Sequence, residues 1–156
     1  MTKMKSYWAS GFKLISTLVE GLKTYPVAAS TSLTLGQAVF DNGSGSATTG
    51  TAFALTFLGF AVAAVDNSTG NAGDKDVQVI PPNPAHMFEV PNGSVTVATQ
   101  SDVTEVIDLE AAGTVDVTDE TVVQWGFKVD KIDITADALT ANAGGYVIGR
   151  MLKMPA

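Results

Sequence analysis

The sequence predicts an all-β fold, a small barrel or sandwich, and three observations favour it. Val and Thr are abundant, with 18 of each among 156 residues, and their branched side chains are stiff and pack well on a pleated surface. Apolar and polar residues alternate in about nine short runs, which turns rich in Gly, Asn and Asp separate. Only 16% of residues are charged, which excludes a disordered acidic chain, a coiled coil and an ordinary helical bundle.

Residues 1–25 are expected to form an N-terminal arm, either extended or as a short helix. The arm carries four lysines and one glutamate, whereas the rest of the chain carries five basic and 15 acidic residues. Its large apolar residues recur at spacings of three or four, which would place them on one face of a helix: Trp8, Phe12, Ile15, Val19 and Leu22. Because such a short helix is not stable alone, we expect the arm to lie against its own domain or a neighbouring subunit.

Residues 26–80 are expected to form the first β-rich half. Period-two alternation predicts strands near residues 33–39, 53–57, 61–65 and 77–79. Clusters of Gly, Asn, Asp and Ser predict turns at residues 41–46 and 66–73. Gly59, inside an apolar run, is expected to mark a β-bulge.

Residues 81–93 hold four of the six prolines, and we expect them to connect the two halves rather than form a central strand. The second β-rich half, residues 94–156, forms either a domain of its own or one domain with residues 26–80. Its predicted strands lie near residues 95–97, 115–117, 123–129, 132–134 and 146–152. Residues 101–110 have helical spacing and are expected to form a short helix or turn.

Composition excludes several classes of function. The chain has no Cys, so thiol nucleophiles, disulfide scaffolds and zinc ribbons are excluded, and its one His limits histidine-based catalysis and metal binding. A net charge of −7 and a pI near 4.4 argue against nucleic acid as a partner. The longest apolar run is too short for a membrane-spanning helix, and the N-terminus lacks the apolar core of a secretory signal. We expect no enzyme activity and no cofactor.

Three candidate motifs favour structural interpretations. His86 has no neighbouring acid or Ser to form a catalytic relay, so we expect a partly exposed loop histidine. Residues 66–76 depart from the EF-hand pattern, which favours a solvated turn and leaves an irregular calcium site open. The acids of residues 102–137 alternate with Val and Ile, as on a solvent-facing sheet surface. Glycosylation-type patterns begin at three positions and, without a secretory signal, indicate loops: Asn42, Asn67 and Asn92.

A series of short apolar patterns covers residues 25–80 and recurs at the end of the chain. In order they are Tyr25-Pro26-Val27-Ala28-Ala29-Ser30, Leu35-Gly36-Gln37-Ala38-Val39, Leu58-Gly59-Phe60-Ala61, Asn71-Ala72-Gly73-Asp74, Val77-Gln78-Val79 and Gly144-Gly145-Tyr146-Val147-Ile148-Gly149-Arg150. This order resembles the capsid decoration, or cement, proteins of tailed bacteriophages. The resemblance covers under half of the chain and leaves the acidic second half without a counterpart.

The resemblance implies a compact, β-tulip-like structural protein that binds the outer surface of a phage capsid and stabilises the shell. The implied partner is the major capsid protein, with the chain as a homotrimer or homodimer at symmetry axes and with no nucleic acid or membrane partner. The implied location is the outside of the virion, after assembly in the host cytoplasm. The arm would order on the shell, with six residues as the capsid-binding set: Lys3, Lys5, Trp8, Phe12, Lys13 and Ile15.

An alternative belongs to another class, an adhesion or carbohydrate-binding β-sandwich of a phage fibre or cell surface. It requires an exposed aromatic platform, and the candidate members are Phe88, Trp125 and Tyr146. Trp125 alternates with Val123 and Phe127, so we expect it in the core, which counts against a platform. A hydrolase with paired acids is a more distant third interpretation.

Overall fold

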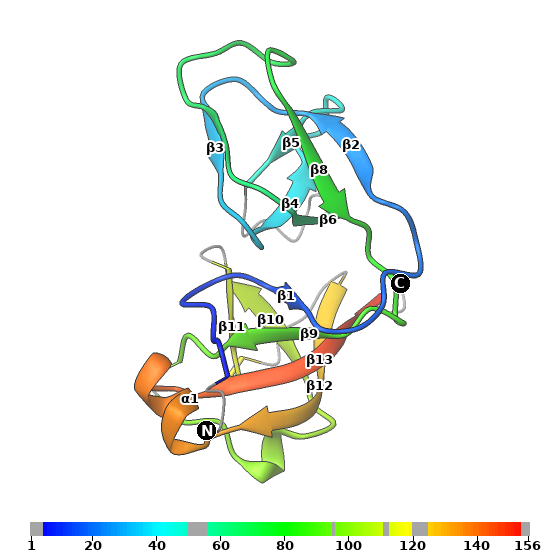
Figure 1. Cartoon of the computed structure of the whole chain (residues 1–156). Helices are drawn as coiled ribbons and strands as arrows, with labels where there is room; N and C mark the ends of the chain where they lie inside the picture. Colours follow the sequence, from blue (N-terminus) through cyan, green and yellow to red (C-terminus); the bar gives the residue numbers. More distant parts are fainter. Residues whose placement is uncertain (1–4, 50–55, 95, 111–112, 120–124, 154–156) are drawn as a thin grey trace.

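The computed structural model describes residues 5–49, 56–94, 96–110, 113–119 and 125–153. The fold is all-β, as predicted, with a single α-helix among these residues, α1 (Ala136–Ala141). Figure 1 shows two lobes, one above the other in this view. The N-terminal lobe contains β2 to β8, and the C-terminal lobe contains β1 and β9 to β13.

The N-terminal lobe is built on a five-stranded antiparallel sheet. Its strand order is β2 (Lys23–Pro26), β8 (Asp76–Ile80), β6 (Phe57–Ala61), β4 (Ala38–Asp41), β5 (Ala47–Thr48). A two-stranded sheet, β3 (Thr31–Leu33) and β7 (Val65–Asn67), lies beside it. The predicted bulge is confirmed, because the register of β4 against β6 shifts opposite Gly59. One isolated bridge, from Val27 to Ala47, joins the two edges of the larger sheet.

The C-terminal lobe is built on a six-stranded antiparallel sheet. Its order is β1 (Lys13–Leu14), β9 (Phe88–Pro91), β13 (Tyr146–Lys153), β12 (Trp125–Asp133), β10 (Val106–Glu110), β11 (Thr114–Asp116). The long pair β12 and β13 forms its centre, with a bulge between Val129 and Lys131. In the described parts of the chain, ladders of paired strands close neither large sheet into a barrel, and the edges of the N-terminal sheet meet only at the single bridge from Val27 to Ala47, so the open, sandwich-like form of the predicted class applies.

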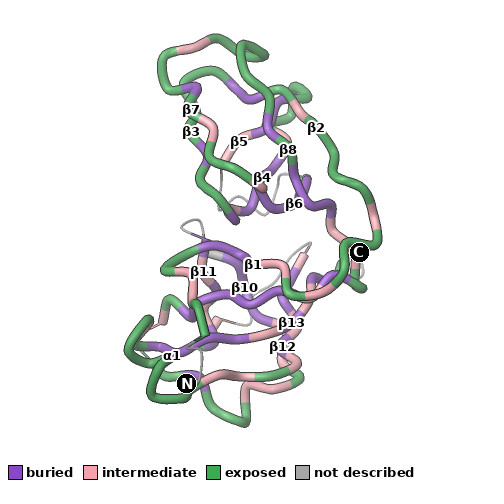
Figure 2. Tube along the Cα trace, viewed as in Figure 1, coloured by how far each residue is buried: buried purple, intermediate pink, exposed green. Residues whose placement is uncertain are grey.

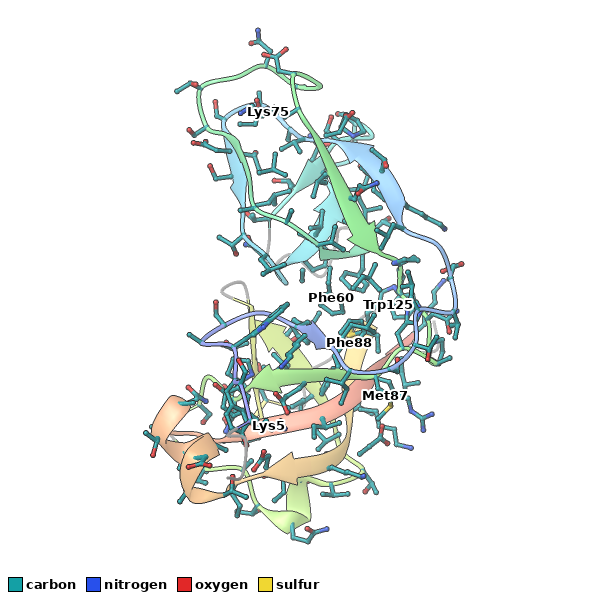
Figure 3. All side chains as sticks on the ribbon, in the orientation of Figure 1. Lys5, Phe60, Lys75, Met87, Phe88 and Trp125 are labelled. Atoms are coloured by element: carbon teal, nitrogen blue, oxygen red, sulfur yellow. The ribbon has the colours of Figure 1, made fainter. Side chains whose placement is uncertain are left out.

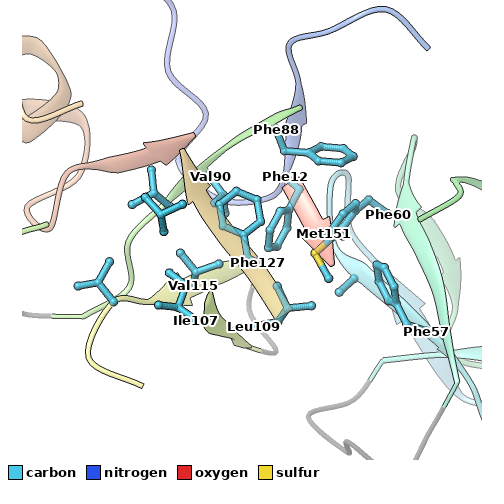
Figure 4. Packing of buried hydrophobic residues seen from close by; sticks show 14 of the residues in the cluster. Phe12, Phe57, Phe60, Phe88, Val90, Ile107, Leu109, Val115, Phe127 and Met151 are labelled. Carbon is cyan, nitrogen blue, oxygen red and sulfur yellow. The ribbon is translucent and has the colours of Figure 1, made fainter. Parts of the chain in front are cut away.

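Phe12 packs where the two lobes meet. Its ring stacks on Phe60 of the N-terminal lobe with centroids 4.1 Å apart, and it meets the edges of Phe88 and Phe127 of the C-terminal lobe at 6.3 and 5.7 Å. Figure 4 shows these rings around Phe12, which is only 1% exposed. One continuous hydrophobic cluster therefore contains residues of both lobes.

The backbone around Phe12 allows this insertion. Gly11 has φ of +95°, and a Cβ there would lie 2.7 Å from the carbonyl oxygen of Leu35, so only glycine fits this chain crossing. Next to it, the N–H of Phe12 donates to the carbonyl of Gly36 at 2.8 Å. The arm is thereby tied to a loop of the N-terminal lobe.

The helical expectation for the arm is wrong, and its extended alternative describes residues 5–22. The backbone donors of the arm bond to distant segments rather than to residues four positions earlier. Gly11 N–H donates to Gly113, Phe12 N–H to Gly36 and Ile15 N–H to Met87. The apolar residues with helical spacing do not share one face, because Phe12 is buried in the core whereas Ile15, Val19 and Leu22 are exposed.

Two further expectations are corrected. Of residues 81–93, only residues 81–87 form a connection, and β9 pairs between β1 and β13 inside the sheet. Pro91 is the last residue of that strand and lies opposite Tyr146 of β13. Of residues 101–110, the start belongs to a 3₁₀ turn (Gln100–Asp102), and the rest is mainly strand β10.

The remaining strand predictions divide into three groups. Strands near residues 57, 77–79, 115, 125–133 and 146–152 are confirmed, whereas the predicted strands at residues 33–39 and 61–65 are interrupted, because residues 34–37 separate β3 from β4 and residues 62–64 separate β6 from β7. The predictions at residues 53–55, 95 and 123 fall outside the described residues. Val97 lies outside the strands, and helix α1, which Thr135 caps through its side chain, was not predicted.

We predict that Phe12→Ala destabilises the protein by about 3–5 kcal/mol, because it removes a ring that both lobes contact and leaves a cavity. Denaturant unfolding measures the loss. The matched control is Ile15→Ala, an exposed residue of the same arm, which should change stability by no more than about 0.5 kcal/mol. Equal stability of the two variants would refute the central position of Phe12.

Candidate interaction surface

A surface-exposed strap, residues 15–22, runs from β1 to β2 and thus from one lobe to the other. Figure 2 shows this segment as mainly exposed, beside the buried strand β9. Of the eight large hydrophobic residues that are exposed in the described parts of the chain, four lie in the strap: Ile15 at 46%, Leu18 at 38%, Val19 at 57% and Leu22 at 42%. The strap is therefore a local concentration of exposed apolar side chains.

His86 fixes the backbone of the strap through hydrogen bonds. It lies in the linker, residues 81–87, which is the second chain crossing between the lobes. Its Nε2 accepts hydrogen bonds from the N–H groups of Val19 at 3.0 Å and Glu20 at 3.4 Å, and its Nδ1 lies 3.2 Å from the carbonyl oxygen of Pro81. Because N–H groups only donate and a carbonyl only accepts, these partners assign the neutral imidazole with its proton on Nδ1.

Further hydrogen bonds join the strap to the linker. Ile15 N–H donates to the carbonyl of Met87 at 2.9 Å, and Met87 N–H donates to the Ser16 hydroxyl at 2.9 Å. These bonds fix the backbone of the strap while its apolar side chains remain exposed. The expectation of a partly exposed loop histidine is wrong, since His86 is fully buried as part of this connection.

The six predicted capsid-binding residues do not share one environment in the structure. Lys3 lies outside the described residues. Phe12 is buried in the core, so it is not a contact for an external partner, which corrects its predicted role. Lys13 donates to the carbonyl of Ser6 at 3.0 Å, and half-buried Trp8 accepts at its carbonyl from Tyr146 Oη at 2.7 Å. Ile15 is exposed and belongs to the strap.

Lys5 is held in a polar cluster on the C-terminal lobe. Its Nζ bonds to Oε2 of Glu89, whose side chain is only 2% exposed, and lies 3.4 Å from Oδ2 of Asp133. Tyr7 Oη donates to Asp133 Oδ2 at 2.5 Å, and the rings of Tyr7 and Tyr146 are 4.7 Å apart. Figure 3 shows Lys5 near the C-terminal sheet. The contacts of Lys5 are thus consistent with docking of the arm on its own lobe.

The polar cluster shifts the pKa values of Lys5 and Asp133. Burial alone would lower the pKa of Lys5, but the hydrogen bond and charge of Glu89, with smaller effects of Tyr7 and Asp133, raise it. Burial would likewise raise the pKa of Asp133, yet hydrogen bonds from Tyr7 and Thr135 and the charge of Lys5 lower it. Lys5 and Asp133 are therefore both charged at neutral pH and form an ion pair with a structural role.

Among the described residues, no group of three or more His, Cys, Asp or Glu side chains is placed to hold a metal ion. Asp66 Oδ1 accepts from Ser68 N–H, Ser68 Oγ and Ser32 Oγ, which lowers the pKa of Asp66 to about 2. Asp66 and Asn67 belong to β7, so the predicted turn begins only at Ser68. A cavity of about 230 Å³ beside Lys5 and Tyr7 is smaller than typical ligand pockets.

Protein-family models, characterised proteins and solved structures all gave no match. Within the described residues, no helix is both long enough and apolar enough to cross a membrane. The strap is therefore the feature of the described surface from which a function is inferred.

We predict that His86→Phe loosens the strap and destabilises the protein by about 1–3 kcal/mol. The apolar ring can neither accept from the N–H groups of Val19 and Glu20 nor donate to the carbonyl of Pro81, so these groups lose their partner. Hydrogen exchange measured by NMR should be faster at the amides of Val19 and Glu20. Amides of Phe127 and Val129, in central strand β12, provide the internal control and should change only with global stability. Unchanged protection at Val19 would contradict the role of His86.

We predict that Tyr7→Phe raises the pKa of Asp133, because the phenol no longer stabilises the carboxylate. A carboxylate with a lowered folded-state pKa stabilises the fold above its unfolded-state pKa, and this contribution is lost as pH falls through the folded-state pKa. The variant should therefore show a smaller loss of stability on acidification. Carboxyl NMR titration checks the shift, with Tyr25→Phe in the other lobe as a control that leaves Asp133 unchanged.

Proposed function

We propose that this protein is a structural virion protein that binds the outer surface of a tailed-phage capsid and cements the shell. The proposal includes the major capsid protein as partner, a homotrimer or homodimer at symmetry axes, and assembly in the host cytoplasm. The sequence resemblance supplies the class of partner. The strap supplies the contact surface that such a protein needs.

One observation carries the proposal, namely that four exposed apolar side chains sit on a backbone that is already fixed. Exposed apolar area is unfavourable in water, so a concentration of it favours a role in association. His86 Nε2 accepts from the N–H of Val19, and the hydroxyl of Ser16 in the strap accepts from the N–H of Met87. A fixed surface loses less conformational entropy on binding than a disordered arm would. Binding by a preformed strap therefore replaces the coupled folding that the sequence alone favoured.

The size of the strap limits what it can do. A stable interface buries roughly 800 Å² on each partner, involving about 20–30 residues, so four side chains can only form its centre. Neighbouring residues of both lobes must complete it. A contact that spans both lobes is suited to mechanical reinforcement, because it would resist their separation as well as that of the shell subunits.

Charge supports one orientation of the protein on its partner. Lys13 and Lys23 flank the strap in sequence, and Lys23 is exposed, whereas residues 26–156 carry a large excess of acids. Because like charges repel across an interface, an acidic partner surface would face the strap rather than the acidic faces. For an acidic shell surface, the strap side is therefore the expected contact, although the strap itself includes Glu20.

The contacts of the aromatic residues count against the carbohydrate-binding alternative. Phe88 and Tyr146 are buried, and half-buried Trp125 packs against Phe57 with ring centroids 5.8 Å apart. Figure 3 shows Phe60, Phe88 and Trp125 near one another where the lobes meet. The three proposed platform residues therefore contribute to packing, and they form no exposed platform for a sugar.

Co-sedimentation with capsids of the encoding phage, stripped of accessory proteins, tests the function. Full-length protein should bind saturably, at a fixed ratio to the major capsid protein. We predict that replacing Leu18, Val19 and Leu22 together with Ser weakens binding by at least tenfold, since each buried aliphatic side chain contributes roughly 1.5–3 kcal/mol. The His86 bonds should survive, because they use backbone groups of the strap.

The matched control replaces Ile134 and Leu139, which are also exposed but lie far from the strap in sequence, with Ser. It should bind like the unchanged protein. Removal of residues 1–25 is unsuitable as a test, because it would remove Phe12 from the core. Undiminished binding by the strap variant would refute the surface, and failure of unchanged protein to bind immature or expanded shells would refute the cement function.

A further inference from the structure

We propose that Asn42 is a site of spontaneous deamidation whose catalytic groups come from its own turn. Asn42 is exposed and begins the turn between β4 and β5, where its N–H donates to the carbonyl of Ser46 at 2.9 Å. It precedes Gly43, which has no side chain to hinder attack by its backbone nitrogen. This modification is independent of the proposed capsid function.

The reaction needs only water. The backbone nitrogen of Gly43 forms a bond to Cγ of Asn42, and the proton of that nitrogen passes to a base. Nδ2 takes up a proton and leaves as ammonia, so that a cyclic imide remains. Water then opens either carbonyl of the imide, giving aspartate or isoaspartate at position 42. No electrons are transferred to an outside acceptor.

The turn positions a base on the attacking group. Gly43 N–H donates to Oδ1 of Asp41 at 2.8 Å, so this carboxylate is within direct reach of the proton that must be removed. Gly45 N–H donates to the same oxygen at 3.1 Å and fixes its position. Asp41 is thereby the expected general base.

The turn also stabilises the charge that develops on the amide. Oδ1 of Asn42 accepts from the N–H groups of Ser44 at 2.9 Å and Ser46 at 3.2 Å. When Cγ becomes tetrahedral, negative charge develops on this oxygen, and the two donors already point at it. A base on the nucleophile and two donors on the oxygen are the groups that acyl transfer requires.

The chain contains an internal comparison at Asn92, which also precedes glycine. Asn92 is buried, and its Nδ2 donates to the carbonyls of Thr96 at 2.8 Å and Gly144 at 3.1 Å. Gly93 N–H donates to the carbonyl of Val115 at 2.7 Å, which is a far weaker base than a carboxylate. The leaving group is held, water is excluded, and no carboxylate accepts the proton.

Conversion of Asn42 has a structural consequence. A carboxylate at this position lies next to Asp41, and isoaspartate adds a backbone atom to a turn closed by the bond to Ser46. The next residue, Ala47, accepts from Ala28 N–H at 2.9 Å and forms the bridge to Val27. Deamidation therefore weakens the closure of the N-terminal lobe as the protein ages.

The test is incubation of the full-length protein under native conditions, followed by peptide mapping that separates Asn, Asp and isoaspartate. Asn42 should convert at least about tenfold faster than Asn92, a barrier difference of about 1.4 kcal/mol. In denaturant the two rates should become similar, since both residues then precede glycine in a flexible chain. Native rates that do not differ, or no conversion at Asn42, would overturn the proposal.

Two variants examine the mechanism. Asp41→Asn keeps the acceptor oxygen but removes the base, and should slow conversion at position 42 by about tenfold or more. Asn42→Gln should abolish it over the same period, because the longer side chain would have to form a larger ring. An unchanged rate in Asp41→Asn, with an unchanged circular dichroism spectrum, would refute the role of Asp41. The wild-type comparison with Asn92 remains decisive if a variant does not fold.

Discussion

The insertion of Phe12 between the lobes is the contact on which the rest of the structure depends. The separate core of the N-terminal lobe consists of small and medium aliphatic residues, whereas its aromatic rings Phe40, Phe57 and Phe60 belong to the cluster shared with the other lobe. Neither lobe therefore completes its core alone, and small units bury too little surface to be stable. Phe12 also fixes the position of the arm, and the strap begins three residues later, at Ile15.

The strap is a consequence of this arrangement. With Phe12 anchored on one side and β2 paired with β8 on the other, residues 15–22 must cross between the lobes. His86 fixes the middle of the crossing through backbone donors, which leaves the side chains outside. An apolar surface that its own fold holds exposed is the strongest structural argument for a partner. The turn at Asn42 differs from the strap, because its polar groups act within the turn itself. The carboxylate of Asp41 accepts from Gly43 N–H, and the N–H groups of Ser44 and Ser46 donate to the Asn42 side chain.

Sequence reasoning succeeded where the strand pattern was regular and failed where distant contacts set the structure. The alternation in β8, β12 and β13 was sufficient to predict these strands. In the arm, spacing that suits a helix was overridden by packing of Phe12 and by backbone bonds to Gly36 and Gly113. Of the predicted binding residues, Ile15 lies on the candidate surface, but no pattern indicated that Leu18, Val19 and Leu22 would be exposed on an extended segment.

By itself the sequence determined the all-β class, the positions of the regular strands, the absence of cysteine chemistry and the contrast between a basic arm and an acidic body. These properties depend on composition and on neighbours a few positions apart. The burial of His86 and the pairing of Lys5 with Glu89 were decided only by the tertiary structure. Their partners lie 67 and 84 positions away in the chain, and a polar side chain shows whether it is buried or exposed only once those partners are in place.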